Sequence, residues 1–128
     1  MAAHKSECFF CNLPEERIIS EGEQCIVIRD GYPVTELHTL IITRRHVANY
    51  FDLTDAERLE VYQHLEQQKM RIEKEDKTVS GFNIGMNCGK DAGQTVMHFH
   101  LHLIPRRMGD MDDPRGGVRG VIPEKQKY

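Results

Sequence analysis

The sequence contains no apolar run long enough to cross a membrane, so no membrane-spanning segment is predicted. It also has no excess of positive charge, because 17 Lys and Arg residues face 20 Asp and Glu residues and the formal net charge is -3 at pH 7. Stable binding to nucleic acid through bulk electrostatics is therefore not expected. The first residues lack the basic and then apolar pattern of a secretory signal. These absences together predict a cytoplasmic location.

Cysteine is scarce as well. The 4 cysteines of the 128-residue chain fit reduced thiols in a cytosol better than a disulfide framework. The composition is 39% hydrophobic and 29% charged, which is typical of a globular protein. No internal repeat or low-complexity segment stands out, and the length suits one domain over residues 1–128.

Segments rich in apolar and β-branched residues predict strands over residues 17–20, 25–30, 37–43, 81–87 and 98–104. Thr54 and Glu57 have the spacing of a capping box, which opens one long predicted helix from about Asp55 to Glu75. We therefore expect an α+β fold in which the helix packs on a face of about five mostly antiparallel strands. Residues 105–128 lack periodicity and predict an irregular C-terminal arm.

One face of the predicted helix carries apolar or long-stemmed side chains at helical spacing, while the other face is charged. The residues at that spacing are Leu59, Tyr62, Leu65, Lys69 and Ile72. His4 and His64 fall outside this pattern, and we expect both to be solvated.

His98, His100 and His102 alternate with apolar residues and are the most informative feature of the chain. Alternate residues of a strand share one face, so the three imidazoles are predicted to project together while Phe99 and Leu101 face a core. Such rings can bind a metal, attack an electrophile or move protons near neutral pH. A neutral imidazole, with a reference pKa of about 6.5, is a good nucleophile at pH 7.

Residues 93–104, Gly-Gln-Thr-Val-Met-His-Phe-His-Leu-His-Leu-Ile, strongly resemble the signature of the histidine-triad (HIT) superfamily. The resemblance extends to residues 37–46 and to the Asn87 loop, and it covers nearly the whole chain from Cys8 to Pro105. It implies a HIT-like fold and a nucleotidyl hydrolase or transferase that cleaves an α-phosphate linkage through a covalent nucleotidyl-histidine intermediate. The arm resembles that of bacterial diadenosine-tetraphosphate-hydrolase-like members.

The resemblance implies catalytic roles for four residues. His100 is the implied nucleophile, and His102 the group that binds the phosphoryl oxygens and stabilises transition-state charge. His38 supports the triad from a neighbouring strand. Thr95 takes a position often held by serine, where its hydroxyl can reach a leaving-group oxygen.

The resemblance also implies a nucleotide site. Gln94 and Asn87 are neutral donors to phosphate or leaving group, and Asp30 fits the position that holds the ribose hydroxyls. Taken alone, Asp30 is equally well explained as a turn-forming residue. The implied nucleotide-binding set is Asp30, Asn87, Gln94, Thr95 and His102.

Cys8 and Cys11 form a Cys-x-x-Cys motif without the thioredoxin-like setting that a redox pair would favour. Two thiolates need two further ligands for a closed tetrahedral zinc site. The resemblance implies that His46 and His98 supply them, giving a structural zinc that ties an N-terminal segment (residues 1–16) to the histidine strand. A metal-free thiol pair remains the alternative, and no organic cofactor is expected.

Two other classes of protein also fit the sequence. A metal-dependent hydrolase that uses the three histidines as ligands is a rival, although no carboxylate lies between His98 and Pro105. A non-enzymatic nucleotide-binding module is another, and the intact His100 argues against it. The leaving group is not fixed, so diadenosine tetraphosphate and adenosine phosphoramidate both fit.

The arm and the oligomeric state carry two further expectations. The resemblance implies a homodimer whose sheets join across a two-fold axis, with each arm near the partner's site. A local basic cluster in the arm predicts contact with the distal phosphates of a long substrate, unless these side chains pair with the acidic residues between 110 and 113. The cluster comprises Arg106, Arg107, Arg115 and Arg119.

Overall fold

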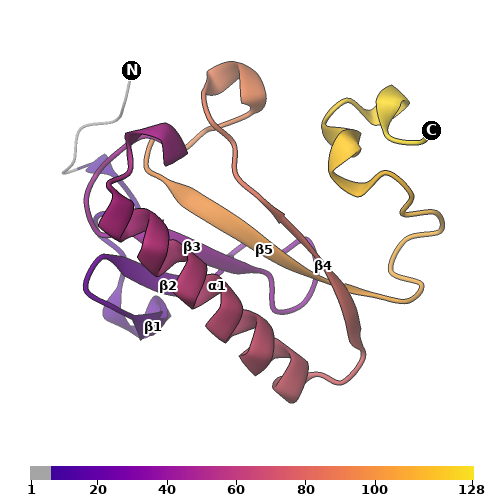
Figure 1. The fold of residues 1–128 in the computed structure, drawn as a ribbon, viewed down its shortest axis with the longest axis horizontal. Helices are drawn as coiled ribbons and strands as arrows, with labels where there is room; N and C mark the ends of the chain where they lie inside the picture. Colours follow the sequence, from indigo (N-terminus) through magenta and orange to yellow (C-terminus); the bar gives the residue numbers. More distant parts are fainter. Residues whose placement is uncertain (1–6) are drawn as a thin grey trace.

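The computed structural model describes residues 7–128, which form a five-stranded sheet with one long helix on a face (Figure 1). Every neighbouring pair of strands is antiparallel, in the order β1-β2-β3-β5-β4. The α+β prediction is therefore confirmed. The strands are β1 (Ile18–Glu21), β2 (Cys25–Arg29), β3 (Thr39–Thr43), β4 (Val79–Gly85) and β5 (His100–Arg107).

Helix α1 spans Asp55–Glu75, the predicted bounds. It begins at a complete capping box: the Glu57 N–H donates to Thr54 Oγ1 at 3.1 Å, and the Thr54 N–H donates to the Glu57 carboxylate at 2.9 Å. These two bonds satisfy donors that a helix N-terminus otherwise leaves unpaired. Within the described residues, no helix is both long and apolar enough to span a membrane.

The helix face that meets the sheet matches the one its apolar spacing predicts only in part, because Leu65 and Ile72 face the core and other predicted positions do not. Leu59 and Tyr62 are 59% and 49% exposed, and Ile72 is buried as expected. Polar side chains take several of the inner positions because neighbouring elements supply partners for them. His64, expected to be solvated, is buried and lies 3.0 Å from Glu60; His4 lies outside the described residues. The buried residues are Glu57, Val61, His64, Gln68 and Ile72.

The sheet has two packed faces, and side-chain alternation divides them. Phe99, just before β5, and Leu101 in it belong to the cluster that Val61 of α1 completes, so the predicted core face of this segment is confirmed. Leu40 and Ile42 of β3 point to the opposite face, where they pack with Phe10. His100 and His102 stand opposite Ile42 and Leu40 in the β3–β5 register. This second face, away from α1, carries the candidate site.

Strand β5 differs from its prediction at both ends. It begins at His100 and continues to Arg107, past Pro105, so the irregular arm starts only at residue 108. Beyond that point the arm contains the 3₁₀ turns Gly117–Val121 and Pro123–Lys125 and lies beside the sheet edge formed by β4 (Figure 1). Other 3₁₀ turns are Glu15–Arg17, Tyr50–Asp52 and Lys90–Ala92.

Candidate active site and metal centre

A cleft of about 700 Å³ opens on the sheet face opposite α1. Its walls include most of the residues that the sequence predicts for catalysis and nucleotide binding, together with apolar side chains from the N-terminal segment and β2. The predicted residues that line it are Asp30, His38, Asn87, Thr95, His100 and His102. His98 and Gln94 are buried behind the wall.

Hydrogen bonding assigns the tautomer of His100. Its Nδ1–H donates to the main-chain carbonyl of His98 at 2.8 Å, which leaves the Nε2 lone pair free of a proton. No other hydrogen bond to this ring occurs within residues 7–128. Phe10 packs edge-on against the ring, with centroids 4.9 Å apart. His100 therefore presents an oriented, unprotonated nitrogen in the cleft.

His102 has the opposite tautomer. The Val34 N–H donates to His38 Nδ1 at 3.0 Å, so the proton of a neutral His38 ring resides on Nε2. That Nε2–H donates to His102 Nδ1 at 2.9 Å, and the proton of His102 consequently lies on its Nε2. The ring centroids of His100 and His102 are 5.2 Å apart. The pair thus offers Nε2 of His100 as an acceptor and Nε2–H of His102 as a donor.

Burial keeps these rings neutral. It lowers the pKa of His100, and it lowers the pKa of His38 despite the opposing charge of Asp30. Burial, helped by the positive forms of His100 and His38, lowers the pKa of His102 to about 4. At neutral pH the cleft therefore contains uncharged imidazoles, the form required for nucleophilic attack and for neutral donation.

The loop between β2 and β3 holds Asp30 and His38 in place. Asp30 Oδ1 accepts the Tyr32 N–H at 2.8 Å in a local turn, and Oδ2 lies 3.4 Å from His38 Nε2. Both readings of Asp30 are thus compatible with its position, because the same carboxylate forms a turn and lines the cleft. Leu37 has a φ of 71°, a left-handed conformation that costs a non-glycine residue about 1–2 kcal/mol.

The loop before β5 places Thr95 and Asn87 on the wall of the cleft but withdraws Gln94 from it. The Gln94 amide donates to the carbonyls of Ala48 and Val96 at 2.6 and 3.1 Å, and its oxygen accepts the Gly89 N–H at 2.8 Å. In this arrangement Gln94 cannot serve as the expected phosphate donor, because both of its amide hydrogens hold the loop together.

Cys8, Cys11, His46 and His98 meet in one cluster, with ligand atoms within 4.8 Å of one another. Sγ of Cys8 and Sγ of Cys11 lie 3.3 and 3.4 Å from His98 Nδ1, and the two histidine Nδ1 atoms are 3.2 Å apart. Ligand atoms of a tetrahedral zinc are about 3.3–3.8 Å apart, given Zn–N and Zn–S bonds of about 2.0–2.3 Å. The four residues therefore fit such an ion.

A carbonyl behind the cluster orients His98. His98 Nε2 donates to the main-chain oxygen of Thr43 at 2.6 Å, which leaves Nδ1 free to act as a ligand. Burial also lowers the pKa of His98 and favours its neutral, metal-binding form. Both ring nitrogens of His98 are therefore engaged away from the cleft, Nε2 with the Thr43 carbonyl and Nδ1 with the cysteine cluster.

The comparison with known families decides the relationship of the chain. Its sequence matches the HIT domain over residues 13–109. The chain belongs to the HIT family. An uncharacterized HIT-like protein of Mycoplasma genitalium is 37% identical over 105 residues, which cover 79% of this chain and 74% of that protein. The AP-4-A phosphorylase of Mycobacterium tuberculosis is 32% identical over 97 residues, and these cover 75% of this chain but only 49% of the phosphorylase.

Solved HIT structures agree with the sequence comparison. A zinc-bound histidine triad family protein of Mycobacterium smegmatis superposes with a TM-score of 0.72 at 34% identity, covering 86% of this chain and 82% of that one. HIT relatives thus share both the sequence pattern and the sheet-and-helix architecture. The metal named for this neighbour belongs to that protein.

Within this HIT chain the predicted arginine cluster is dispersed. Arg106 binds Asp110 at 2.8 and 2.9 Å, the acidic pairing that the sequence left open, and Arg107 binds Asp76 at 2.9 and 3.1 Å. Arg119 lies over the ring of Tyr128. None of the four arginines of the cluster lines the cleft of its own chain.

Sequence reasoning missed several residues that shape the HIT cleft. Phe9 and Phe10 lie between the motif cysteines and line the cleft, and Tyr32 and Val34 form part of its rim, where they are 94% and 69% exposed. Their apolar character carries no catalytic pattern in the sequence. Only the three-dimensional path of the N-terminal segment and of the β2–β3 loop brings them together.

Proposed function

We propose that the protein is a nucleotidyl hydrolase or transferase that works through a nucleotidyl-histidine intermediate. One observation carries the proposal: His100 and His102 stand side by side in the cleft as opposite neutral tautomers. One ring supplies a lone pair for phosphorus, and its neighbour supplies an N–H for a phosphoryl oxygen. That combination suits in-line displacement at a phosphate.

In the proposed reaction His100 Nε2 attacks the α-phosphorus, so a P–N bond forms and the P–O bond to the leaving group breaks. His102 Nε2–H donates to a non-bridging oxygen and offsets the charge that builds there. Thr95 lines the cleft, and in this proposal its hydroxyl donates a hydrogen bond to the leaving oxygen. Water then attacks the same phosphorus, the P–N bond breaks, and His100 returns to its starting form.

A dinucleoside polyphosphate such as diadenosine tetraphosphate is the proposed substrate, and adenosine phosphoramidate the alternative. The relative named AP-4-A phosphorylase supports the first. A turnover panel with both compounds ranks them by kcat/KM. If the protein turns over neither compound faster than the uncatalysed rate, the non-enzymatic binding module is favoured instead.

His100→Ala tests the mechanism directly. The variant removes the group that forms the covalent bond, so turnover should fall by roughly 10³-fold or more while nucleotide binding stays within a few fold. Acid-quenched wild-type protein should carry a labile nucleotide on one histidine. A variant that keeps a tenth of the wild-type rate would exclude the covalent route.

We propose a structural zinc at Cys8, Cys11, His46 and His98, bound with no open position for substrate. The ligand atoms suit a closed tetrahedral site. The catalytic-metal rival is not favoured, because within residues 7–128 no candidate metal cluster joins all three triad histidines. His98 belongs to the cysteine cluster, whereas His102 lies with Asp30 and His38.

We also propose a cytoplasmic homodimer. Leu59 and Tyr62 on α1 and Ile84 on β4 are exposed apolar side chains, 59%, 49% and 46% accessible. β4 forms one edge of the sheet, so a second copy could pair along it and cover these side chains. Reduced cysteines and the lack of a spanning helix in the described residues fit the location.

A further inference from the structure

A second cluster of metal-ligating side chains lies on the opposite side of the sheet from the catalytic cleft. Cys25 is the first residue of β2, and Glu60 and His64 are one turn apart on α1. One ligand atom from each residue falls within 4.8 Å of the others. All three are largely withdrawn from solvent: Cys25 is fully buried, and the side chains of His64 and Glu60 are 9% and 14% exposed.

The main chain fixes the carboxylate of this cluster. Glu60 Oε2 accepts the Cys25 N–H at 2.7 Å and lies 3.0 Å from His64 Nε2, while Oε1 accepts the Gln24 N–H at 3.0 Å. Because the carboxylate is anchored to the start of β2, it is held beside the Cys25 thiol and the imidazole. Few rotamer changes would then be needed to bring three donors to one ion.

Gly22 leaves the space that the cluster occupies. A Cβ at this position would clash with Glu60 Oε2 and would lie only 3.0 Å from His64 Nε2. Beside these atoms a surface hollow of about 250 Å³ is lined by Gly22, Glu60, Gln63, His64 and Gln67. A glycine and an open hollow give an ion a route from solvent and room for a water ligand.

We propose that Cys25, Glu60 and His64 form a second metal site, for a divalent transition-metal ion of the zinc type, with water from the hollow in the fourth position. One thiolate, one carboxylate and one imidazole are ligands that such ions accept. On binding, the Cys25 S–H bond breaks, its proton passes to solvent and a sulfur–metal bond forms. The ion also replaces the Glu60–His64 hydrogen bond.

The second site binds more weakly than the Cys8 cluster. Burial and the charges of Glu60 and Glu57 raise the pKa of the Cys25 thiol to about 12, so the ion must displace a firmly held proton. The site also has three protein ligands where the Cys8 cluster has four. An occupied site would join the start of β2 to α1 and would stabilise the folded chain.

Zinc binding by the full-length chain tests this inference. Equilibrium dialysis should give a second, weaker equivalent of zinc, and cadmium NMR should give two signals, because one site has two thiolates and the other has one. Cys25→Ala and His64→Gln should each remove the weaker equivalent and its signal. Cys88→Ala, a matched loss of a cysteine in the loop after β4, should retain both.

Two further variants make the outcome decisive. Gly22→Ala should lower the affinity of the weaker equivalent by tenfold or more, since the methyl displaces the ligands without removing one. Cys8→Ser combined with Cys11→Ser should retain the one-thiolate signal. Absence of a second equivalent in the wild type, or its survival in both Cys25→Ala and His64→Gln, would overturn the proposal.

Discussion

At the scale of single residues, the three triad histidines differ in the partner that each ring nitrogen meets. His98 donates to Thr43 and faces two cysteines, His100 donates to the carbonyl of His98, and His102 accepts from His38. Identical side chains thereby become a candidate ligand, a candidate nucleophile and a candidate donor. The backbone carbonyl of His98 links the cysteine cluster to the cleft, because it orients the next histidine on the same face.

The pKa of His102 predicts how stability depends on pH. The unfolded chain binds a proton at this ring below about pH 6.5, whereas the folded chain does so only near 4. The unfolded state therefore holds more protons in this interval, and the free energy of unfolding should fall by roughly 1–3 kcal/mol as pH drops through it. Urea unfolding at pH 7 and pH 5 measures the change. His102→Asn should show a flatter profile, and an unchanged slope would contradict the assignment.

Residue-level prediction from sequence succeeds where a local pattern dictates geometry and fails where the fold supplies the partner. The period of two places His100 and His102 on one face, as the structure has them. Gln94 is different, because its amide partners at Ala48 and Val96 depend on how two loops pack. The left-handed Leu37 is also invisible in the sequence, since no glycine or asparagine marks the turn.

At the scale of elements, the described part of the N-terminal segment, residues 7–16, lies outside the sheet, and its cysteines contact histidines next to β3 and β5. Cys8 is buried and Phe10 packs against β2 and β3, so the segment forms part of the cleft wall. Metal binding at the cysteines would fix this wall in place.

Removal of zinc should therefore affect the fold before it affects the chemistry. Purified protein should carry about one tightly bound zinc per chain. Chelation should clearly lower the melting temperature, while the initial rate, measured below that temperature, should fall much less. Cys8→Ser with Cys11→Ser should behave in the same way. If activity instead follows zinc occupancy while the melting temperature stays constant, the metal is catalytic.

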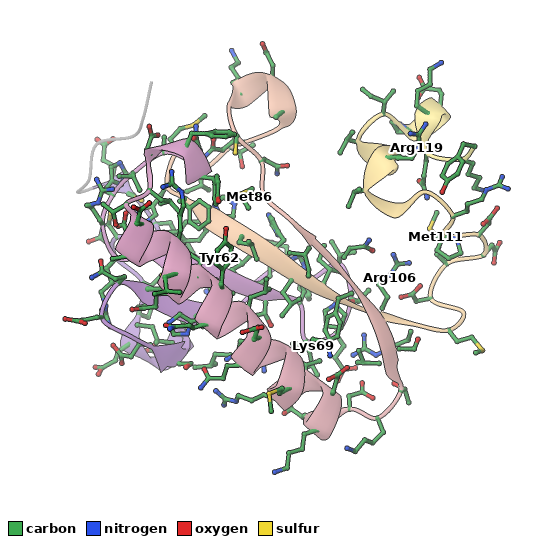
Figure 2. All side chains as sticks on the ribbon, in the orientation of Figure 1. Tyr62, Lys69, Met86, Arg106, Met111 and Arg119 are labelled. Carbon is green, nitrogen blue, oxygen red and sulfur yellow. The ribbon has the colours of Figure 1, made fainter. Side chains whose placement is uncertain are left out.

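Asp110 holds the start of the C-terminal arm by accepting hydrogen bonds from the Arg106 guanidinium and the Arg107 N–H, and the turn Gly117–Val121 contacts β4. Removing residues 112–128 keeps the Arg106–Asp110 and Arg107–Asp76 pairs and so should leave the fold of the chain intact. Arg115 and Arg119 lie in this arm, where Figure 2 labels Arg119, and neither lines the cleft of its own chain. Any contact between them and a polyphosphate would come from the arm of a partner protomer.

Truncation of the arm should then reduce selectivity for long phosphate chains. The fall in kcat/KM for diadenosine tetraphosphate should correspond to a loss of about 1–3 kcal/mol of transition-state stabilisation, because guanidinium contacts to the distal phosphates are lost. Hydrolysis of adenosine phosphoramidate should fall much less. Equal losses on both substrates would show that the arm supports the fold or the dimer only.

At the scale of the whole molecule, the surface of α1 explains why its buried face could not be predicted from apolar spacing. Leu59 and Tyr62, the latter labelled on α1 in Figure 2, follow helical spacing, yet both are exposed in the single chain. Glu57 and His64 occupy inner positions because Arg45 and Glu60 pair with them. An apolar pattern in a helix indicates a face that is buried. It does not indicate whether that face packs in the chain's own core or against another chain.

The dimer prediction follows from this exposed surface. Sedimentation should give a mass of two chains, and Leu59→Glu combined with Ile84→Lys should shift it to one by placing charges where apolar contact is expected. Leu59 and Ile84 lie outside the cleft, so the single-chain fold should persist by circular dichroism. The matched control Met70→Glu, at a position that is 69% exposed farther along α1, should leave the mass unchanged.

The alternation in β5 limits how the length of this protein can change. His100 and His102 face the cleft while Leu101 and Leu103 fill the core, so deleting Leu101 would reverse the faces of all strand residues that follow it. His102 would then enter the core under α1, and Leu103 would enter the cleft. Loss of one residue here should therefore abolish folding and chemistry together. Insertions and deletions are instead expected to be tolerated after residue 110, where no strand register is shared with the site.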